Sequence, residues 1–159
     1  MNRSPFVRVF VHRFLPLLCA ISVAASAETL PPKMRQPTPE EVVAEHFAAL
    51  NACDWNRVMA QYDDDIVFLR KDGVIIQGRE AVGKMFRDSL KNPPEGGLCG
   101  RVLTPEHTFV VGDTVNVEWR VEAPFFAETY RGAEAFETRN GLLAAQVTTW
   151  DPAAVKMKK

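Results

Sequence analysis

A turn-rich stretch at residues 92–100, NPPEGGLCG, divides the chain into two parts with different patterns of apolar residues. Before it, apolar side chains recur mostly at helical intervals, and after it they alternate with polar side chains as in half-buried strands. Two hairpin signals, Gly112-Asp113 and Arg139-Asn140-Gly141, join the later strands in pairs. Helices followed by paired strands predict an α+β domain, in which the helices cover one face of a mostly antiparallel sheet.

The predicted order is helix, helix, two strands, helix and four strands. The first helix has a clear start, because Thr38 can cap it, Pro39 suits its first position and Glu41 completes a capping box. The predicted helices span residues 39–51, 55–62 and 79–90. The predicted strands span residues 66–70, 74–77, 101–111, 114–123, 130–138 and 142–150.

Residues 1–27 have the composition of a secretory signal peptide. A basic start with Arg3, Arg8 and Arg13 precedes an apolar run over residues 14–24, and Ala25-Ser26-Ala27 is a small-x-small cleavage site. The apolar run is too short to cross a bilayer as a stable helix. We expect cleavage after Ala27 and a secreted or periplasmic protein, with a retained N-terminal anchor as the alternative.

The remainder divides into an extended leader (28–37), one folded domain (38–151) and a solvated C-terminal tail (152–159). The chain is 47% hydrophobic and 25% charged, which is ordinary for a globular domain. Its net charge is −1, and residues 1–27 carry three arginines and no acid, so the cleaved chain is more acidic. A mildly acidic surface without basic runs argues against nucleic acid or anionic membranes as partners.

Two cysteines, Cys53 and Cys99, follow the predicted cleavage site. An exported chain meets oxidising conditions, so an even number of cysteines favours a disulfide. Closing this loop would stabilise the fold by about 4 kcal/mol in the chain-entropy model. Two separate buried thiols are the alternative.

Several classes of catalytic site match the sequence poorly. The run Asp63-Asp64-Asp65 has no histidine beside it, and the two histidines after residue 27 lack ligand spacing, so we expect no metal. Ser89, the only serine after residue 27, has no nucleophile-elbow pattern. The segment GGLCG lacks the Gly-Lys-Ser/Thr ending of a phosphate loop. We therefore predict no cofactor.

The order and spacing of these segments resemble the nuclear transport factor 2-like superfamily, also called SnoaL-like, which includes ketosteroid isomerases and scytalone dehydratase. The resemblance covers residues 38–151. It is carried by NACDWNRVMAQYDDDIVF for the helix–helix–strand unit, IIQGREAVGKMF for the strand–Gly–helix step, and VNVEWRVEA with YRGAEAFETRNGLLAAQVTTWD for the closing strands. It implies a cone, in which a curved sheet wraps three helices around one deep, mostly apolar cavity.

The resemblance places two polar residues in that cavity. His46 interrupts the apolar stripe of the first helix and aligns with the oxyanion-binding tyrosine of steroid isomerases, while Arg70 aligns with their base aspartate. Their second acid falls near Ala133. A guanidinium cannot act as a base near neutral pH, so the resemblance does not carry the isomerase chemistry over.

His46 and Arg70 are nevertheless the candidate catalytic pair. The imidazole could act as acid, base or neutral donor, and the guanidinium could bind a carboxylate, enolate or phosphate. Arg70 would also lower the pKa of a neighbouring His46 by like-charge repulsion. The alternatives are a core histidine with a satisfied ring and a strand-end arginine in solvent.

Seven aromatic residues are candidate ligand-binding walls, with core packing as the alternative. They are Trp55, Tyr62, Phe68, Phe86, Trp119, Tyr130 and Trp150. Pro124-Phe125-Phe126 lies between two predicted strands and could form a cavity mouth, a lid or a self-association patch.

Three functions follow from this reading. The leading hypothesis is binding of a small, mainly apolar ligand with an anionic or carbonyl group. The second is a lyase, isomerase or hydrolase-like enzyme in which His46 transfers a proton and Arg70 stabilises an oxyanion. The third is a non-catalytic module that forms a homodimer through the outer face of its sheet.

Overall fold

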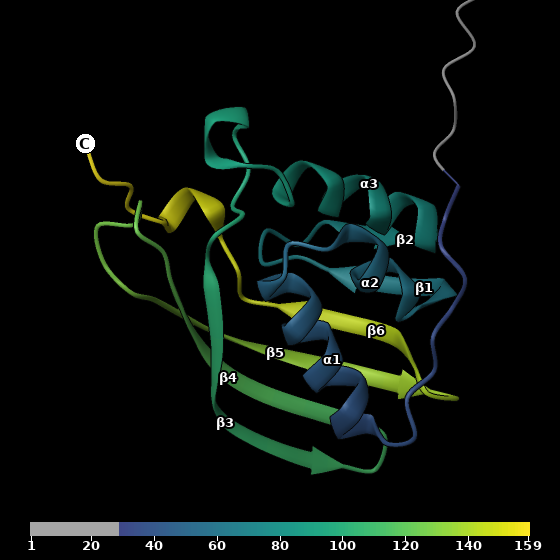
Figure 1. The fold of residues 1–159 in the computed structure, drawn as a ribbon. Coiled ribbons are helices and arrows are strands. Elements are labelled where there is room, and N and C mark those ends of the chain that lie inside the picture. Colours follow the sequence, from purple (N-terminus) through teal and green to yellow (C-terminus); the bar gives the residue numbers. More distant parts are fainter. Residues whose placement is uncertain (1–28) are drawn as a thin grey trace, which may run out of the picture.

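The computed structural model describes residues 29–159, and the predicted signal peptide with its cleavage site lies outside them (Figure 1). The α-helices are α1 (Pro39–Asn51), α2 (Trp55–Ala60) and α3 (Arg79–Ser89), and the short 3-10 helices are η1 (Pro93–Glu95) and η2 (Pro152–Ala154). The strands are β1 (Tyr62–Leu69), β2 (Ile75–Gln77), β3 (Val102–Val111), β4 (Thr114–Glu122), β5 (Tyr130–Arg139) and β6 (Leu142–Thr148). The predicted order of elements is confirmed. Within the described range, no helix is long and apolar enough to span a membrane.

The six strands form one curved sheet in the order β2-β1-β6-β5-β4-β3, and the helices lie on one side of it (Figure 1). All neighbouring strands are antiparallel except β1 and β6, which run parallel. The buried side of the sheet presents residues such as Ile66, Val115 and Phe136 to the helices, and each is fully buried. This is the predicted α+β cone.

Thr38 caps α1 as predicted, but Glu41 does not complete the capping box within the described residues, because its carboxylate accepts from the Thr38 hydroxyl at 3.4 Å and not from the Thr38 amide. The Thr38 hydroxyl accepts a hydrogen bond from the Glu41 amide at 3.2 Å. The helix then buries Val42, Phe47 and Leu50 against the sheet, together with His46. Because His46 lies on this buried face, the helix directs the imidazole inward.

The aspartate run departs from its predicted position. α2 ends at Ala60, two residues earlier than expected, and β1 begins at Tyr62, so that Asp63, Asp64 and Asp65 lie within a strand. Aspartate is unfavourable in strands, but ion pairs with neighbouring cations compensate for this unfavourable preference. Lys33 contacts Asp63 at 3.1 Å and Asp64 at 2.7 Å, and Arg139 contacts Asp65 at 2.5 Å.

The C-terminal tail is not a free end. Residues 125–127 pair with it: the Lys158 amide donates to the Phe125 carbonyl at 2.9 Å, and the Ala127 amide donates to the Lys156 carbonyl at 2.7 Å. Phe126 is buried in the core beneath this contact, so it does not form an exposed lid or self-association patch. The lysines of the tail remain exposed, as expected.

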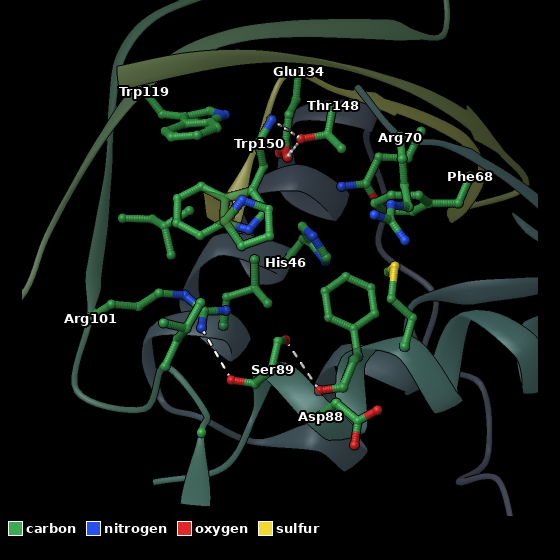
Figure 2. Close-up of a pocket in the computed structure, with 18 residues that line it drawn as sticks. His46, Phe68, Arg70, Asp88, Ser89, Arg101, Trp119, Glu134, Thr148 and Trp150 are labelled. Atoms are coloured by element: carbon green, nitrogen blue, oxygen red, sulfur yellow. Dashed lines mark hydrogen bonds between the residues drawn. The ribbon is translucent and has the colours of Figure 1, made fainter. Parts of the chain in front are cut away.

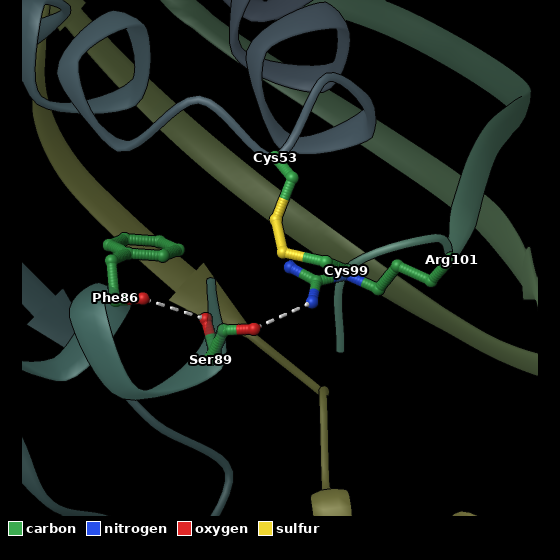
Figure 3. The surroundings of a disulfide bond; sticks show 5 residues. All are labelled: Cys53, Phe86, Ser89, Cys99 and Arg101. Carbon is green, nitrogen blue, oxygen red and sulfur yellow. Dashed lines mark hydrogen bonds between the residues drawn. A yellow bond between two sulfur atoms is a disulfide. The ribbon is translucent and has the colours of Figure 1, made fainter. Parts of the chain in front are cut away.

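Cys53 and Cys99 form a disulfide with a Cα–Cα distance of 5.5 Å (Figure 3). The bond joins the end of α1 to the loop that precedes β3. This loop also carries Leu98 and Arg101, which line the cavity described below. The disulfide therefore ties one wall of the cavity to the first helix.

Reduction of the disulfide should destabilise the fold and loosen that wall. We expect the free energy of unfolding to fall by about 4 kcal/mol, because the unfolded chain regains the entropy of a long open loop. Urea unfolding, followed by tryptophan fluorescence with and without reductant, measures the change. The Cys53→Ala/Cys99→Ala variant should unfold at the lower midpoint in both conditions. An unchanged midpoint in wild-type protein whose thiols titrate as reduced would contradict the prediction.

Candidate functional site

A cavity of about 470 Å³ lies between α1, α3 and the concave face of the sheet (Figure 2). Its inner walls are mostly apolar, and its mouth opens among the exposed side chains of Arg70, Asp88 and Pro152. The sheet supplies one side, from the end of β1 and from β3, β4, β5 and β6. The position of the cavity follows from the fold, because a strongly curved sheet leaves space that three helices do not fill.

The predicted candidates separate into two groups. Both His46 and Arg70 line the cavity, and so do four of the seven predicted aromatics, namely Phe68, Phe86, Trp119 and Trp150. The other three, Trp55, Tyr62 and Tyr130, do not line it and pack behind its wall. Trp55 donates to the Gly83 carbonyl at 2.9 Å, and Tyr130 stacks on Trp119 with a centroid distance of 6.0 Å.

His46 is fully buried, and its ring projects into the cavity between aromatic neighbours (Figure 2). Its centroid lies 5.6 Å from that of Tyr62 and 5.5 Å from that of Phe136, both in edge contacts. Among the described residues, neither ring nitrogen has a hydrogen-bond partner. Both nitrogens are also shielded from solvent, so within the described part of the chain the ring carries two polar atoms without a partner at the wall of the cavity.

The electrostatic surroundings keep this ring neutral. Burial is the main cause, and the positive charge of Arg101 adds to it; together they lower the pKa of His46 to about 3, against an opposing influence of the Gln61 side chain. The direction agrees with the expectation from the sequence, but the repelling cation is Arg101 and not Arg70.

Arg70 lies at the mouth of the cavity, just after β1. Its side chain is 40% exposed, and its Nη2 contacts the Asp72 carboxylate at 2.7 Å. Arg70 therefore fits both predictions from the sequence, a cavity residue and a strand-end arginine in solvent, since it lines the cavity and is also exposed to solvent. An arginine already paired with an acid is a weaker anion site than an unpaired one.

Arg101 is the cavity cation that sequence reasoning missed. It is buried, and its Nη1 donates to the Ser89 carbonyl at 3.4 Å (Figure 3). Within residues 29–159, no carboxylate lies close enough to form a salt bridge with it. Burial lowers its pKa to about 10, while Glu134 acts in the opposite direction. The one signal in the sequence was its place two residues after Cys99, because a disulfide there fixes the start of β3 against α1.

Glu134 is the second functional residue that was missed. It lies on β5 directly opposite Thr148 of β6, whose hydroxyl donates to its Oε1 at 2.5 Å. Glu134 is half-buried, and it lines the cavity, through which solvent can reach it. Burial raises its pKa to about 7, against hydrogen bonds from Thr148 and Gln146 and the charge of Arg101. Its signal was the resemblance, which placed the second acid of the isomerases one residue away, near Ala133.

These residues give the cavity several kinds of chemical group. It joins apolar walls to a buried cation, a neutral imidazole and a carboxyl whose pKa lies near neutral pH. Such a set can bind an anionic group and can exchange a proton with a ligand. Across the described part of the chain, no three His, Cys, Asp or Glu side chains gather closely enough to hold a metal ion.

Comparisons with solved structures agree with the cone fold at low sequence identity. A cystatin fold protein from Novosphingobium aromaticivorans, described as uncharacterized, is 14% identical with a TM-score of 0.60, covering 72% of this chain and 100% of that chain. A protein with a ketosteroid isomerase-like fold from Catenulispora acidiphila, solved with trimethylamine, is 17% identical with a TM-score of 0.55, covering 74% and 90%. An LEH-like epoxide hydrolase from M. tuberculosis is 18% identical with a TM-score of 0.57, covering 71% and 82%.

The comparison of the sequence with curated proteins finds no match. The family model of the SnoaL-like domain matches residues 43–146, which is more than half of the chain and includes His46, Arg101 and Glu134. The chain therefore belongs to the family of proteins with a SnoaL-like domain.

Proposed function

We propose that the protein binds a small, mainly apolar ligand whose anionic or carbonyl group is held by Arg101 inside the cavity. The observation that carries this proposal is the burial of the Arg101 guanidinium on the cavity wall without a carboxylate at salt-bridge distance among the described residues. Burying a charge without a counter-charge is costly, and an anionic or strongly polar ligand group would offset that cost.

The remainder of the cavity suits the body of such a ligand. Its volume of about 470 Å³ lies within the range of small-molecule sites. Trp119, Phe86 and Trp150 offer apolar surface, and the neutral ring of His46 offers a hydrogen bond. Arg70 at the mouth would attract the same anion as it enters. The proposed site of action is outside the cytoplasm, on the evidence of the signal-like composition of residues 1–27.

Substitution of Arg101 should distinguish the contribution of the anionic group to binding affinity from that of the apolar body. Anilinonaphthalene sulfonate has an apolar body and an anionic group, and phenylnaphthylamine is the same body without the sulfonate. We expect Arg101→Leu to weaken binding of the sulfonate by roughly 10- to 100-fold, because one charge-assisted contact is lost, and to leave the neutral probe unaffected. Fluorescence titration measures both affinities.

The matched control is Arg120→Leu, which removes an arginine that pairs with Glu106 and does not line the cavity. This variant should bind both probes as the wild type does. Equal affinities of wild type and Arg101→Leu for the sulfonate would show that Arg101 is not the anion site.

The second candidate function is proton transfer at a ligand atom next to the group held by Arg101. It is favoured by Glu134, because a carboxyl whose pKa is about 7 is suited to accept and return a proton at neutral pH. His46, with a pKa of about 3, is better suited to remain a neutral hydrogen-bonding group. In this scheme Glu134 takes the proton-transfer role first considered for His46, and Arg101 stabilises the oxyanion in place of Arg70.

Glu134 should give the stability of the protein a distinctive pH dependence. As pH rises from about 4.5 to about 7, the unfolded chain loses the Glu134 proton while the folded chain keeps it, so the contribution of Glu134 to stability falls. Above pH 8 we expect Glu134→Gln to be more stable than wild type by about 3 kcal/mol, and at pH 4 the two should be nearly equal. Urea unfolding at several pH values measures the difference.

His46 has the opposite effect on the pH dependence of stability. Because its pKa is lowered in the folded protein, its contribution to stability is lost as pH falls from 6.5 towards 3. This term is common to both proteins and cancels in their difference. Glu137→Gln, at an exposed position of the same strand, is the matched control and should differ from wild type by a constant amount. A constant difference for Glu134→Gln as well would argue against a buried titrating carboxyl.

Self-association through the outer face of the sheet is a separate proposal. Phe109, Val111 and Val147 are exposed on strands β3 and β6, with Phe109 61% and Val111 67% accessible. Phe109 and Val147 also border a shallow depression on that face. Exposed apolar surface of this kind is typical of interfaces.

We expect the wild type to sediment as a dimer and Phe109→Asp to sediment as a monomer, because a buried, unpaired carboxylate would oppose association. Sedimentation velocity over a range of concentrations measures both states. Lys84→Asp, on the helical side, is the control and should leave the dimer intact. A wild-type protein that sediments as a monomer at high concentration would contradict the proposal.

A further inference from the structure

Tyr62 and Gln146 form a buried hydrogen-bonded pair that connects the cavity wall, at Gln146, to the core behind it, at Tyr62. The Tyr62 hydroxyl donates to the Gln146 Oε1 at 2.6 Å, and both side chains are almost completely buried. Gln146 also lines the cavity, whereas Tyr62 does not. The carbonyl end of the Gln146 amide therefore meets Tyr62, which leaves its NH₂ end for a different partner.

The register of the sheet supplies that partner. Glu134 lies opposite Thr148, and Gln146 precedes Thr148 by two residues, so Gln146 and Thr148 extend from the same face of β6. Gln146 is the diagonal neighbour of Glu134 across this pair of strands, within reach of a long side chain. An interaction with the Gln146 side chain favours the ionised form of the Glu134 carboxyl, as does the hydroxyl of Thr148.

We propose that Tyr62 and Gln146 are positioning residues for Glu134: Tyr62 fixes the orientation of the Gln146 amide, and Gln146, with Thr148, holds the Glu134 carboxyl toward the cavity as a hydrogen-bond acceptor. This inference rests on the second candidate function, proton transfer by Glu134. It assigns a role to Tyr62, which the sequence suggested as a wall residue and the structure places behind the wall.

The physical basis is the asymmetry of the glutamine amide. One end of the amide donates and the other accepts, so a reversed Gln146 would set its carbonyl against the Glu134 carboxylate and repel it. The Tyr62 hydroxyl prevents the reversal by occupying the carbonyl end. With two donors from β6 in place, a carboxyl on this largely apolar wall can still ionise near neutral pH, where burial alone would keep it protonated.

Other charged or titratable groups also face the cavity, and their effects on the pKa of Glu134 have to be distinguished from those of Tyr62 and Gln146. Arg101 approaches from the loop before β3, the neutral His46 from α1, and Arg70 and Asp88 stand at the mouth. Arg101 also lowers the pKa of Glu134 through its charge. A decisive test changes the hydrogen bonds to Glu134 and leaves all four of these residues intact.

Nuclear magnetic resonance of protein labelled at glutamate carboxyls and glutamine amides provides that test. The loss of one signal in Glu134→Gln assigns the Glu134 carboxyl. In wild type we expect the Gln146 side-chain amide to shift with the same midpoint as Glu134. In Gln146→Met, the Glu134 midpoint should rise by about one pH unit, which corresponds to one hydrogen bond to a charged group. Tyr62→Phe should raise it by a smaller amount.

Thr138→Val is the matched control, because it removes a buried hydroxyl of β5 that donates to the Asp113 carbonyl at 2.9 Å and does not touch the cavity. It should leave the Glu134 midpoint unchanged. The proposal is overturned if the Gln146 amide does not follow Glu134, if neither Gln146→Met nor Tyr62→Phe moves the midpoint, or if Thr138→Val moves it equally. Should Gln146→Met fail to fold, Tyr62→Phe and the wild-type amide decide the question.

The experiment separates this inference from the proposals on which it depends. It requires no ligand, so its outcome does not bear on the binding of the sulfonate probe by Arg101. A wild-type Glu134 midpoint near 4.5 would remove the second candidate function. A wild-type Glu134 midpoint near 7 that stays the same in Gln146→Met and Tyr62→Phe would contradict only the positioning role of these two residues.

Discussion

The parallel pairing of β1 with β6 is the constraint on which the rest of the structure depends. It joins the first strand of the chain to the last and so closes the helical part against the strand-rich part. Because β6 lies between β1 and β5, β1 brings Tyr62 beside Gln146 on one side, and β5 brings Glu134 opposite Thr148 on the other. The cavity and its polar groups therefore assemble only when residues far apart in the sequence meet across β6.

The apolar pattern of the sequence was sufficient to predict the elements, because periodicity and caps are local properties. Thr38 and the Asn140-Gly141 turn could be recognised in this way, and in the turn both residues adopt the positive φ angles that such a hairpin requires. The pairing of β1 with β6 is non-local and leaves no signal in either strand. The sequence therefore predicted the order of the elements, and the resemblance supplied their arrangement.

The candidate site was predicted in part for the same reason. His46 could be found because an imidazole in an apolar stripe conflicts with the local pattern. Arg101 and Glu134 follow ordinary patterns, one at a strand start and the other among alternating strand residues, and their burial becomes visible only when the sheet has curved. Polar residues placed in a cavity by curvature are invisible to strand parity, which tells which face a residue occupies and not what covers that face.

The three polar groups of the cavity, His46, Arg101 and Glu134, constrain one another's charge. Arg101 repels a proton from His46 and attracts negative charge to Glu134, so the most favourable arrangement has one cation, one neutral ring and a carboxyl near its point of ionisation. An anion bound at Arg101 would cancel that attraction and shift Glu134 towards its protonated form. Binding and proton uptake would thus be coupled through the same guanidinium, whose loop the disulfide anchors to α1. Such coupling would make the position of this loop, as well as the identity of the residues, important for what the cavity binds.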